Sequence, residues 1–151
     1  MSIKQKLADM GIAVPSGAQT FGAYVPAKRV GDAIFVSGQL PMKDGKLLAE
    51  GIVGDGVTLE EAQAAARQCV INALVGVEAA GIGMDSITGV TRVGCFVAST
   101  TGFTDQPKVA NAASEFLHAL FGESGQHVRA AVGVASLPLN AAVEIEFTFS
   151  A

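Results

Sequence analysis

One long helical pattern, from Thr58 to Gly81, constrains the fold of this chain more than any other feature. Glu61 follows Thr58 at the spacing of a capping box, in which a hydroxyl and a carboxylate accept hydrogen bonds from exposed amides at a helix start. Apolar side chains then recur at helical spacing, at Leu59, Ala62, Ala66, Cys69, Ala73 and Val77. Gly81 fits the left-handed position that ends many helices. The pattern predicts a long helix with one apolar face.

Strand-like runs and further helices flank this element. The predicted elements are a helix over Ile3–Ile12, strands over Tyr24–Val30 and Ala33–Val36 joined at Gly31-Asp32, a turn at Asp44-Gly45, a strand over Val90–Ala98, a helix from Pro107 to Gly122, a loop over Gly122–Gly125, and strands over Val128–Leu137 and Ala142–Phe149. Helices interspersed with hairpins predict an α+β domain, in which one mostly antiparallel sheet carries two helices on one face. Neighbouring subunits are expected to bury the other face.

Composition favours an oligomer and argues against nucleic acid as a partner. Half of the 151 residues are hydrophobic, and the mean hydropathy of +0.43 indicates apolar surface buried between subunits. A net charge of −4 without a basic run does not suit a surface that follows phosphates. No apolar stretch approaches the roughly 20 residues that span a bilayer, so we expect a cytoplasmic protein. Cys69 and Cys95 stand alone in apolar contexts and are expected to be buried free thiols.

Several segments resemble the RidA/YjgF family, which is also described as endoribonuclease L-PSP-like. They are Val128–Pro138 followed by Val143–Glu146, the Ser-Gly-Gln-x-Pro segment within Phe35–Pro41, the long helix over Ala66–Gly81, and Asn111-Ala112 with Glu115. The similarity runs over roughly residues 18–150 in the family's order. It divides the chain into an N-terminal helical extension over 1–17 and a family-like domain over 18–151.

The resemblance implies a chorismate-mutase-like homotrimer with ligand sites in the clefts between subunits. Several members of the family hydrolyse enamine or imine intermediates released by pyridoxal-phosphate enzymes, and the products are a 2-oxo acid and ammonia. We therefore expect an enamine/imine deaminase acting on 2-amino-2-alkenoate-type intermediates. No cofactor and no metal are implied, because adding water to a reactive imine needs little more than positioning. Two alternatives stay open: a non-catalytic trimer that binds 2-oxo acids and regulates another protein, and an endoribonuclease.

The resemblance assigns the two catalytic roles to Arg129 and Glu144. A guanidinium matches a substrate carboxylate with two parallel hydrogen bonds, although Arg129 could instead pair with a neighbouring carboxylate at a rim. Glu144 matches an acidic residue that holds or activates the attacking water. It also alternates with apolar residues as in any half-solvated strand, so an ordinary exposed role stays open. His127 adjoins Arg129 and is expected at the surface, with proton transfer as the alternative.

Five further residues are predicted to bind substrate. Tyr24 corresponds to a tyrosine that reaches into the neighbouring subunit's cleft, although an alanine precedes it here where relatives have proline. Ser37 and Gly38 are expected to supply small polar and backbone donors, and Asn111 to close the rim. Ala131 stands where many relatives carry a cysteine, so that position would act through its backbone N–H. The packing roles of these residues are alternatives that the sequence leaves open.

Counting residues in the predicted C-terminal hairpin gives a geometric constraint. If Leu137 pairs with Ala142, then Glu144 lies opposite Ala135, and Arg129 points from the same face. Six positions at about 3.3 Å each separate the two by roughly 20 Å within one chain. Either they serve different sites, or one site takes them from two subunits.

Overall fold

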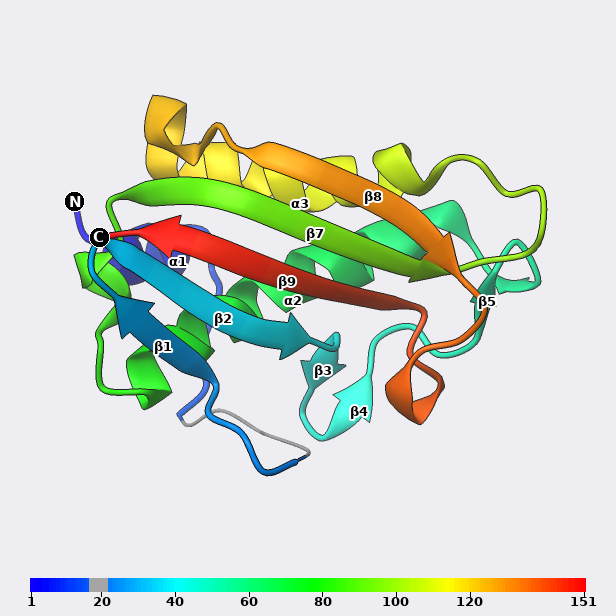
Figure 1. The fold of residues 1–151 in the computed structure, drawn as a ribbon, viewed down its shortest axis with the longest axis horizontal. Coiled ribbons are helices and arrows are strands. Elements are labelled where there is room, and N and C mark those ends of the chain that lie inside the picture. The colour runs from blue at the N-terminus through cyan, green and yellow to red at the C-terminus, as the bar shows by residue number, and fades with distance from the viewer. Residues whose placement is uncertain (17–21) are drawn as a thin grey trace.

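The computed structural model describes residues 1–16 and 22–151 and has an α+β architecture (Figure 1). Its helices are α1 (Ile3–Asp9), α2 (Leu59–Ala79) and α3 (Gln106–Phe121). Its strands are β1 (Ala27–Val30), β2 (Ala33–Gln39), β3 (Met42–Lys43), β4 (Lys46–Leu47), β5 (Ile52–Val53), β6 (Gly56–Val57), β7 (Gly89–Ala98), β8 (Val128–Val134) and β9 (Val143–Ser150), and short 3₁₀ turns cover Met84–Ser86, Gly122–Gly125 and Pro138–Asn140.

The main sheet has five strands in the order β1-β2-β9-β7-β8. Three of its four strand pairs are antiparallel, and only β7 and β8 run parallel. Figure 1 shows α2 and α3 side by side behind this sheet, with α2 packed on β2 and β9 and α3 on β7 and β8. The predicted order of two strands, helix, strand, helix and two strands is therefore confirmed, as is the single helical layer.

The predicted C-terminal hairpin is wrong. β8 pairs in parallel with β7 and lies at the edge of the sheet, whereas β9 lies between β2 and β7. The link between β8 and β9 is a 3₁₀ turn with positive φ at Leu139 and Asn140, and the Asn140 carbonyl accepts a hydrogen bond from Gly51 N. The loop before α2 thus holds this link and directs β9 into the centre of the sheet, so the turn does not return the chain beside β8.

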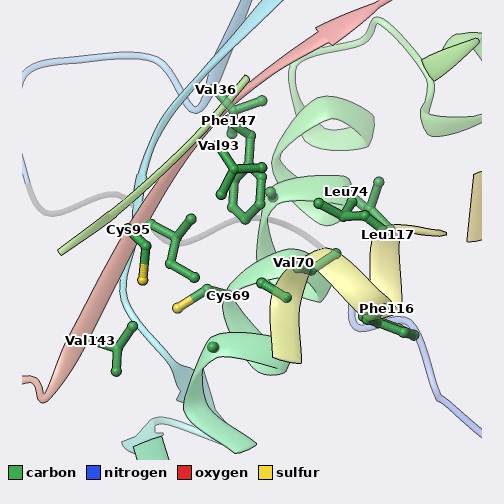
Figure 2. Close-up of a cluster of buried hydrophobic side chains, with 14 of the residues drawn as sticks. Val36, Cys69, Val70, Leu74, Val93, Cys95, Phe116, Leu117, Val143 and Phe147 are labelled. Atoms are coloured by element: carbon green, nitrogen blue, oxygen red, sulfur yellow. The ribbon is translucent and has the colours of Figure 1, made fainter. Parts of the chain in front are cut away.

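The long helix forms as its sequence pattern predicts. Thr58 Oγ1 accepts a hydrogen bond from Glu61 N at 3.1 Å, Glu61 Oε2 accepts one from Thr58 N at 3.4 Å, and Gly81 has a φ of +77°. Figure 2 shows Cys69 on α2 and Cys95 on β7 within the layer of buried side chains between helix and sheet. Both cysteines are free thiols, as expected.

The other face of the sheet carries no helix and exposes apolar side chains. The register places Val30, Phe35, Val128 and Val132 on this open face, and each is between 46% and 68% exposed. Side chains on β9 that point the other way, such as Phe147 and Phe149, are buried under the helices. Within the described residues, no helix combines the length and apolar character needed to cross a bilayer.

The N-terminal helix is shorter than predicted and is attached to the helical layer. Asp85 Oδ1 accepts hydrogen bonds from Ile3 N at 2.7 Å and Lys4 N at 3.2 Å, and Lys4 forms a 2.6 Å ion pair with Glu78. The helix ends at Asp9, before Gly11 with its φ of +73°. The predicted domain boundary at residue 17 lies outside the described residues and stays a prediction.

Two other boundaries differ from the expectation. β1 begins at Ala27, because residues 22–26 form bends and loop, so Tyr24 lies outside the strand predicted for it. The predicted loop at Gly122–Gly125 is a 3₁₀ turn that starts at Gly122, whose φ is +62°. The predicted turn at Asp44-Gly45 is confirmed, and it joins β3 and β4.

Candidate functional site

A cavity of about 1000 Å³ lies where α2, the end of β2 and residues 11–15 meet. Four predicted site residues line it, namely Tyr24, Ser37, Gly38 and Glu144. They come together because β1 pairs with β2 only as far as Val36, so the last residues of β2 have no strand beside them on that edge. We call this cavity the Glu144 cavity.

Glu144 is half-buried in this cavity on the open face of the sheet. Burial, and then the like charge of Glu146, raise the pKa of its carboxyl above the ordinary value. Gly38 lies directly against it, because a Cβ at that position would collide with Glu144 Oε1. Gly38 therefore provides the space that this carboxylate occupies.

The polar groups of Ser37 are bound within the chain. Its hydroxyl donates to Val25 O at 2.7 Å, and its backbone N–H donates to Pro26 O at 3.0 Å. Ser37 thus fixes the segment that follows Tyr24, whose side chain is 48% exposed at the cavity. To donate to a substrate, as predicted, the Ser37 hydroxyl would have to break its hydrogen bond to Val25 O.

Two polar residues of α2, Gln68 and Asn72, also line this cavity and were not predicted from the sequence. Gln68 Nε2 donates to Asn72 Oδ1 at 2.9 Å, and Asn72 Nδ2 donates to Leu40 O and Met42 O, each at 2.9 Å. Their spacing of four residues places them on one helix face, next to the apolar stripe. Together they attach α2 to the chain that connects β2 and β3, so the cavity wall is held by side chains.

The remaining polar site residues form a second cluster, at the edge strand β8. Arg129 Nη1 donates to Asn111 Oδ1 at 2.8 Å and to Ser114 Oγ at 3.1 Å, both on α3. Ser114 Oγ lies 2.8 Å from His127 Nε2, and His127 Nδ1 lies 2.6 Å from Gly125 O. Arg129, Ser114 and His127 line a cavity of about 590 Å³, which we call the Arg129 cavity.

His127 is thus half-buried and hydrogen-bonded, which differs from the surface position expected for it. Ser114 was not identified from the sequence, although it follows Asn111 by three residues and so shares its helix face. Ser114 contacts Arg129 directly, His127 contacts Ser114, and neither residue lines the Glu144 cavity.

Ala131 packs against the core under α3, opposite Cys95 of β7. Burial raises the pKa of the Cys95 thiol to about 12, and burial likewise raises that of Cys69 well above its ordinary value. Neither thiol stands at position 131, which is an alanine in this chain. The part of Ala131 that can face a ligand is its backbone.

The structure does not bring Arg129 and Glu144 together within one chain. Arg129 on β8 pairs with Val93 on β7, and Val93 pairs with Phe147 on β9, so all three point to the helix-covered face. Glu144 points to the open face. Three residue rows and two strand spacings separate their Cα atoms by roughly 14 Å. The same-face prediction was therefore wrong, because it depended on a hairpin that does not form.

Among the described residues, no group of three or more His, Cys, Asp or Glu side chains could hold a metal ion. The two cavities instead present a cation held by neutral partners and a carboxylate with a raised pKa. A cation of this kind can bind a carboxylate, and a carboxylate of this kind can accept a proton from water.

Comparisons with known proteins agree on the type of fold and on the relatives. A family model described as "YjgF/chorismate mutase-like, putative endoribonuclease" matches residues 4–150. Protein TCP17 of Trypanosoma cruzi is 39% identical over 145 residues, which cover 95% of this chain and 91% of that protein. A 2-iminobutanoate/2-iminopropanoate deaminase of Dermatophagoides farinae is 33% identical over 135 residues, which cover 89% and 91%.

Two crystal structures extend this similarity to the whole fold. A protein of unknown function from Agrobacterium tumefaciens is 41% identical, with a TM-score of 0.88 and coverage of 99% of this chain and 91% of that one. A structure from Shewanella oneidensis, with the same endoribonuclease description as the family model, is 28% identical, with a TM-score of 0.92 and full coverage of both chains. The architecture is therefore the chorismate-mutase-like one.

Proposed function

Because the chain belongs to the YjgF/chorismate mutase-like family, we propose that it is an enamine/imine deaminase acting on 2-amino-2-alkenoate-type intermediates. The observation that carries the proposal is the arrangement at Arg129. Both N–H groups of Nη1 are bound to α3, and Nε and Nη2 form no hydrogen bond with the described residues. That edge can receive a carboxylate with two parallel hydrogen bonds. The relative named as a deaminase supports the same reaction class.

The proposed reaction adds water to an imine and releases ammonia. Arg129 holds the substrate carboxylate, and Glu144 accepts a proton from water while the water oxygen bonds to the imine carbon. Glu144 passes that proton to the imine nitrogen, which gives a carbinolamine. Glu144 then accepts the hydroxyl proton and transfers it to the amino nitrogen as the carbonyl forms and the carbon–nitrogen bond breaks, so a 2-oxo acid and ammonia leave. The raised pKa of Glu144 suits a base, since a stronger base removes a proton from water more readily.

We further propose that each site is built from two subunits of a homotrimer. Arg129 and Glu144 lie on opposite faces of one sheet, so a second chain is needed to bring a carboxylate near both. The open face, with Phe35 and Val132 exposed, offers the apolar surface that subunit contacts would bury. Light scattering should return the mass of three chains, and a monomer or dimer mass would contradict the assembly.

The function is tested by ammonia release from 2-aminoacrylate generated in situ by a serine dehydratase. Wild type should accelerate release over the reaction without added protein, and Arg129→Ala should lose about 10- to 100-fold in kcat/KM, because charge-assisted hydrogen bonds to the carboxylate are lost. Arg29→Ala is the matched control, since Arg29 is exposed on β1 and, among the described residues, its side chain hydrogen-bonds only to Gly31 O. Wild type that binds 2-oxobutanoate without accelerating release would support the binding-protein alternative.

A further inference from the structure

When the imidazole of His127 is neutral, only one placement of protons satisfies all the hydrogen bonds from Arg129 through Ser114 to His127. Gly125 O is a carbonyl oxygen and can only accept, so His127 Nδ1 carries the proton of that 2.6 Å contact. Arg129 Nη1 can only donate, so Ser114 Oγ accepts from it at 3.1 Å. The hydroxyl proton of Ser114 then points to His127 Nε2, which is 2.8 Å away and accepts it.

From this accounting we propose that Ser114 and His127 are positioning residues, which hold the Arg129 guanidinium so that its Nε and Nη2 edge stays open to a substrate carboxylate. The inference rests on the proposed function. Nη1 has two N–H groups, and Asn111 and Ser114 take one each. A guanidinium is planar, so fixing Nη1 at two points also fixes the direction of the opposite edge.

His127 acts on Arg129 indirectly, through Ser114. A serine hydroxyl rotates freely, and without a fixed acceptor its proton could point toward Arg129 and repel the cation. The imidazole prevents this, because Gly125 O fixes its tautomer and presents Nε2 to the hydroxyl. Gly125 is itself buried, and a Cβ there would lie 2.6 Å from Leu117 O, so the carbonyl is held in place by close packing against α3.

Ser114 Oγ and His127 Nε2, 2.8 Å apart, also have the separation of a nucleophile and its general base. Their other contacts favour a role in positioning Arg129 instead. A nucleophilic oxygen needs a lone pair directed at its substrate, whereas one lone pair of Ser114 accepts from Arg129. Donation from a cation also lowers the electron density on that oxygen. A serine-directed fluorophosphonate should therefore leave Ser114 unmodified, as judged by the mass of its peptide, and an adduct at Ser114 would overturn the positioning assignment.

The affinity for 2-oxobutanoate, measured by calorimetry on the intact assembly, tests the proposal by matched substitutions. Ser114→Ala should raise Kd and KM by about tenfold with kcat within about twofold, because a misaimed clamp weakens ground-state and transition-state binding alike. Ser114→Thr retains the hydroxyl and should bind like wild type.

The His127 substitutions test the second residue of the pair. His127→Asn keeps only a donor near the Nδ1 position and should raise Kd as Ser114→Ala does. His127→Gln keeps an acceptor near the Nε2 position and should have the Kd of wild type. Ser124→Ala, at an exposed serine of the adjoining 3₁₀ turn, should change nothing.

The imidazole ¹⁵N spectrum supplies a readout that does not depend on turnover. The chain has two histidines, so a His118→Asn sample assigns the His127 signals. Wild type should show the tautomer protonated at Nδ1, and the other tautomer would overturn the proposal. Unchanged affinity in Ser114→Ala, or no binding of 2-oxobutanoate by wild type, would also overturn it. If affinity changes as expected but no ammonia is released, the positioning role stands and the deaminase assignment fails.

Discussion

The Glu144 cavity and the Arg129 cavity differ in how they hold their charged group. Arg129 is held by direct hydrogen bonds to Asn111 and Ser114, and Ser114 in turn contacts His127. Glu144, in contrast, forms no ion pair with a described residue and is confined by burial and by Gly38. The two groups lie on opposite faces of the sheet, so they cannot neutralise each other within a chain. Within one chain the fold thus keeps the cation and the carboxylate apart, and the proposed function combines them across two subunits.

The largest expected effect comes from Glu144→Gln, which removes the proposed base and leaves the Arg129 cavity intact. We expect kcat to fall by about 10²- to 10⁴-fold, the usual contribution of a positioned general base, while 2-oxobutanoate still binds. The measurement is ammonia release from 2-aminoacrylate at saturating dehydratase flux. A variant that keeps wild-type kcat would remove Glu144 from the mechanism.

Mixing two impaired variants tests whether the two cavities combine across subunits. In random mixtures of Arg129→Ala and Glu144→Gln chains, a site that takes one residue from each of two neighbours is intact in about a quarter of cases, so about a quarter of wild-type activity should return after joint refolding. Sites built within single chains would recover nothing. The separately refolded variants, mixed afterwards under conditions without exchange, provide the baseline.

A smaller effect is expected when a methyl group displaces Glu144 without removing it. Gly38→Ala places a Cβ against Glu144 Oε1, so the carboxylate must move, and we expect a loss of about tenfold in kcat. Gly94→Ala is the matched control, because its Cβ would meet Arg92 and Glu146 on the same open face instead. Equal losses in both variants would point to general disturbance of the sheet rather than to Glu144.

The smallest effect is a shift in pH dependence. Glu144 acts as a base only when ionised, so activity should fall as pH drops through its raised pKa. Glu146→Gln removes the like charge that contributes to this shift, which lowers the pKa of Glu144 and should move the acidic limb of kcat/KM to lower pH. Movement to higher pH would contradict the assignment of this limb to Glu144, because the substitution also releases Arg92, paired with Glu146 at 2.9 Å, and a nearby guanidinium lowers the pKa of a carboxyl.

Much of the fold could be predicted from the sequence, because its signals are local. The capping box at Thr58, the apolar stripe of α2 and the turn at Asp44-Gly45 depend on residues a few positions apart, and each appears where its pattern predicts. The resemblance also identified the charged residue of each cavity, Glu144 and Arg129. Ser114 carried no comparable signal, and His127 was identified only as a neighbour of Arg129, since the two residues are adjacent only once β8 packs against α3.

The sequence by itself determined the order of the elements, the apolar faces that pack together and the buried state of the two thiols. Tertiary structure alone decided the order of the strands, and with it the face from which each side chain points. A turn sequence near Pro138 is compatible with a hairpin, but the contact of Asn140 with Gly51 and the buried side chains of β9 favour a central place for that strand. Strand pairing is set by the free energy of burying whole faces, which no local pattern encodes.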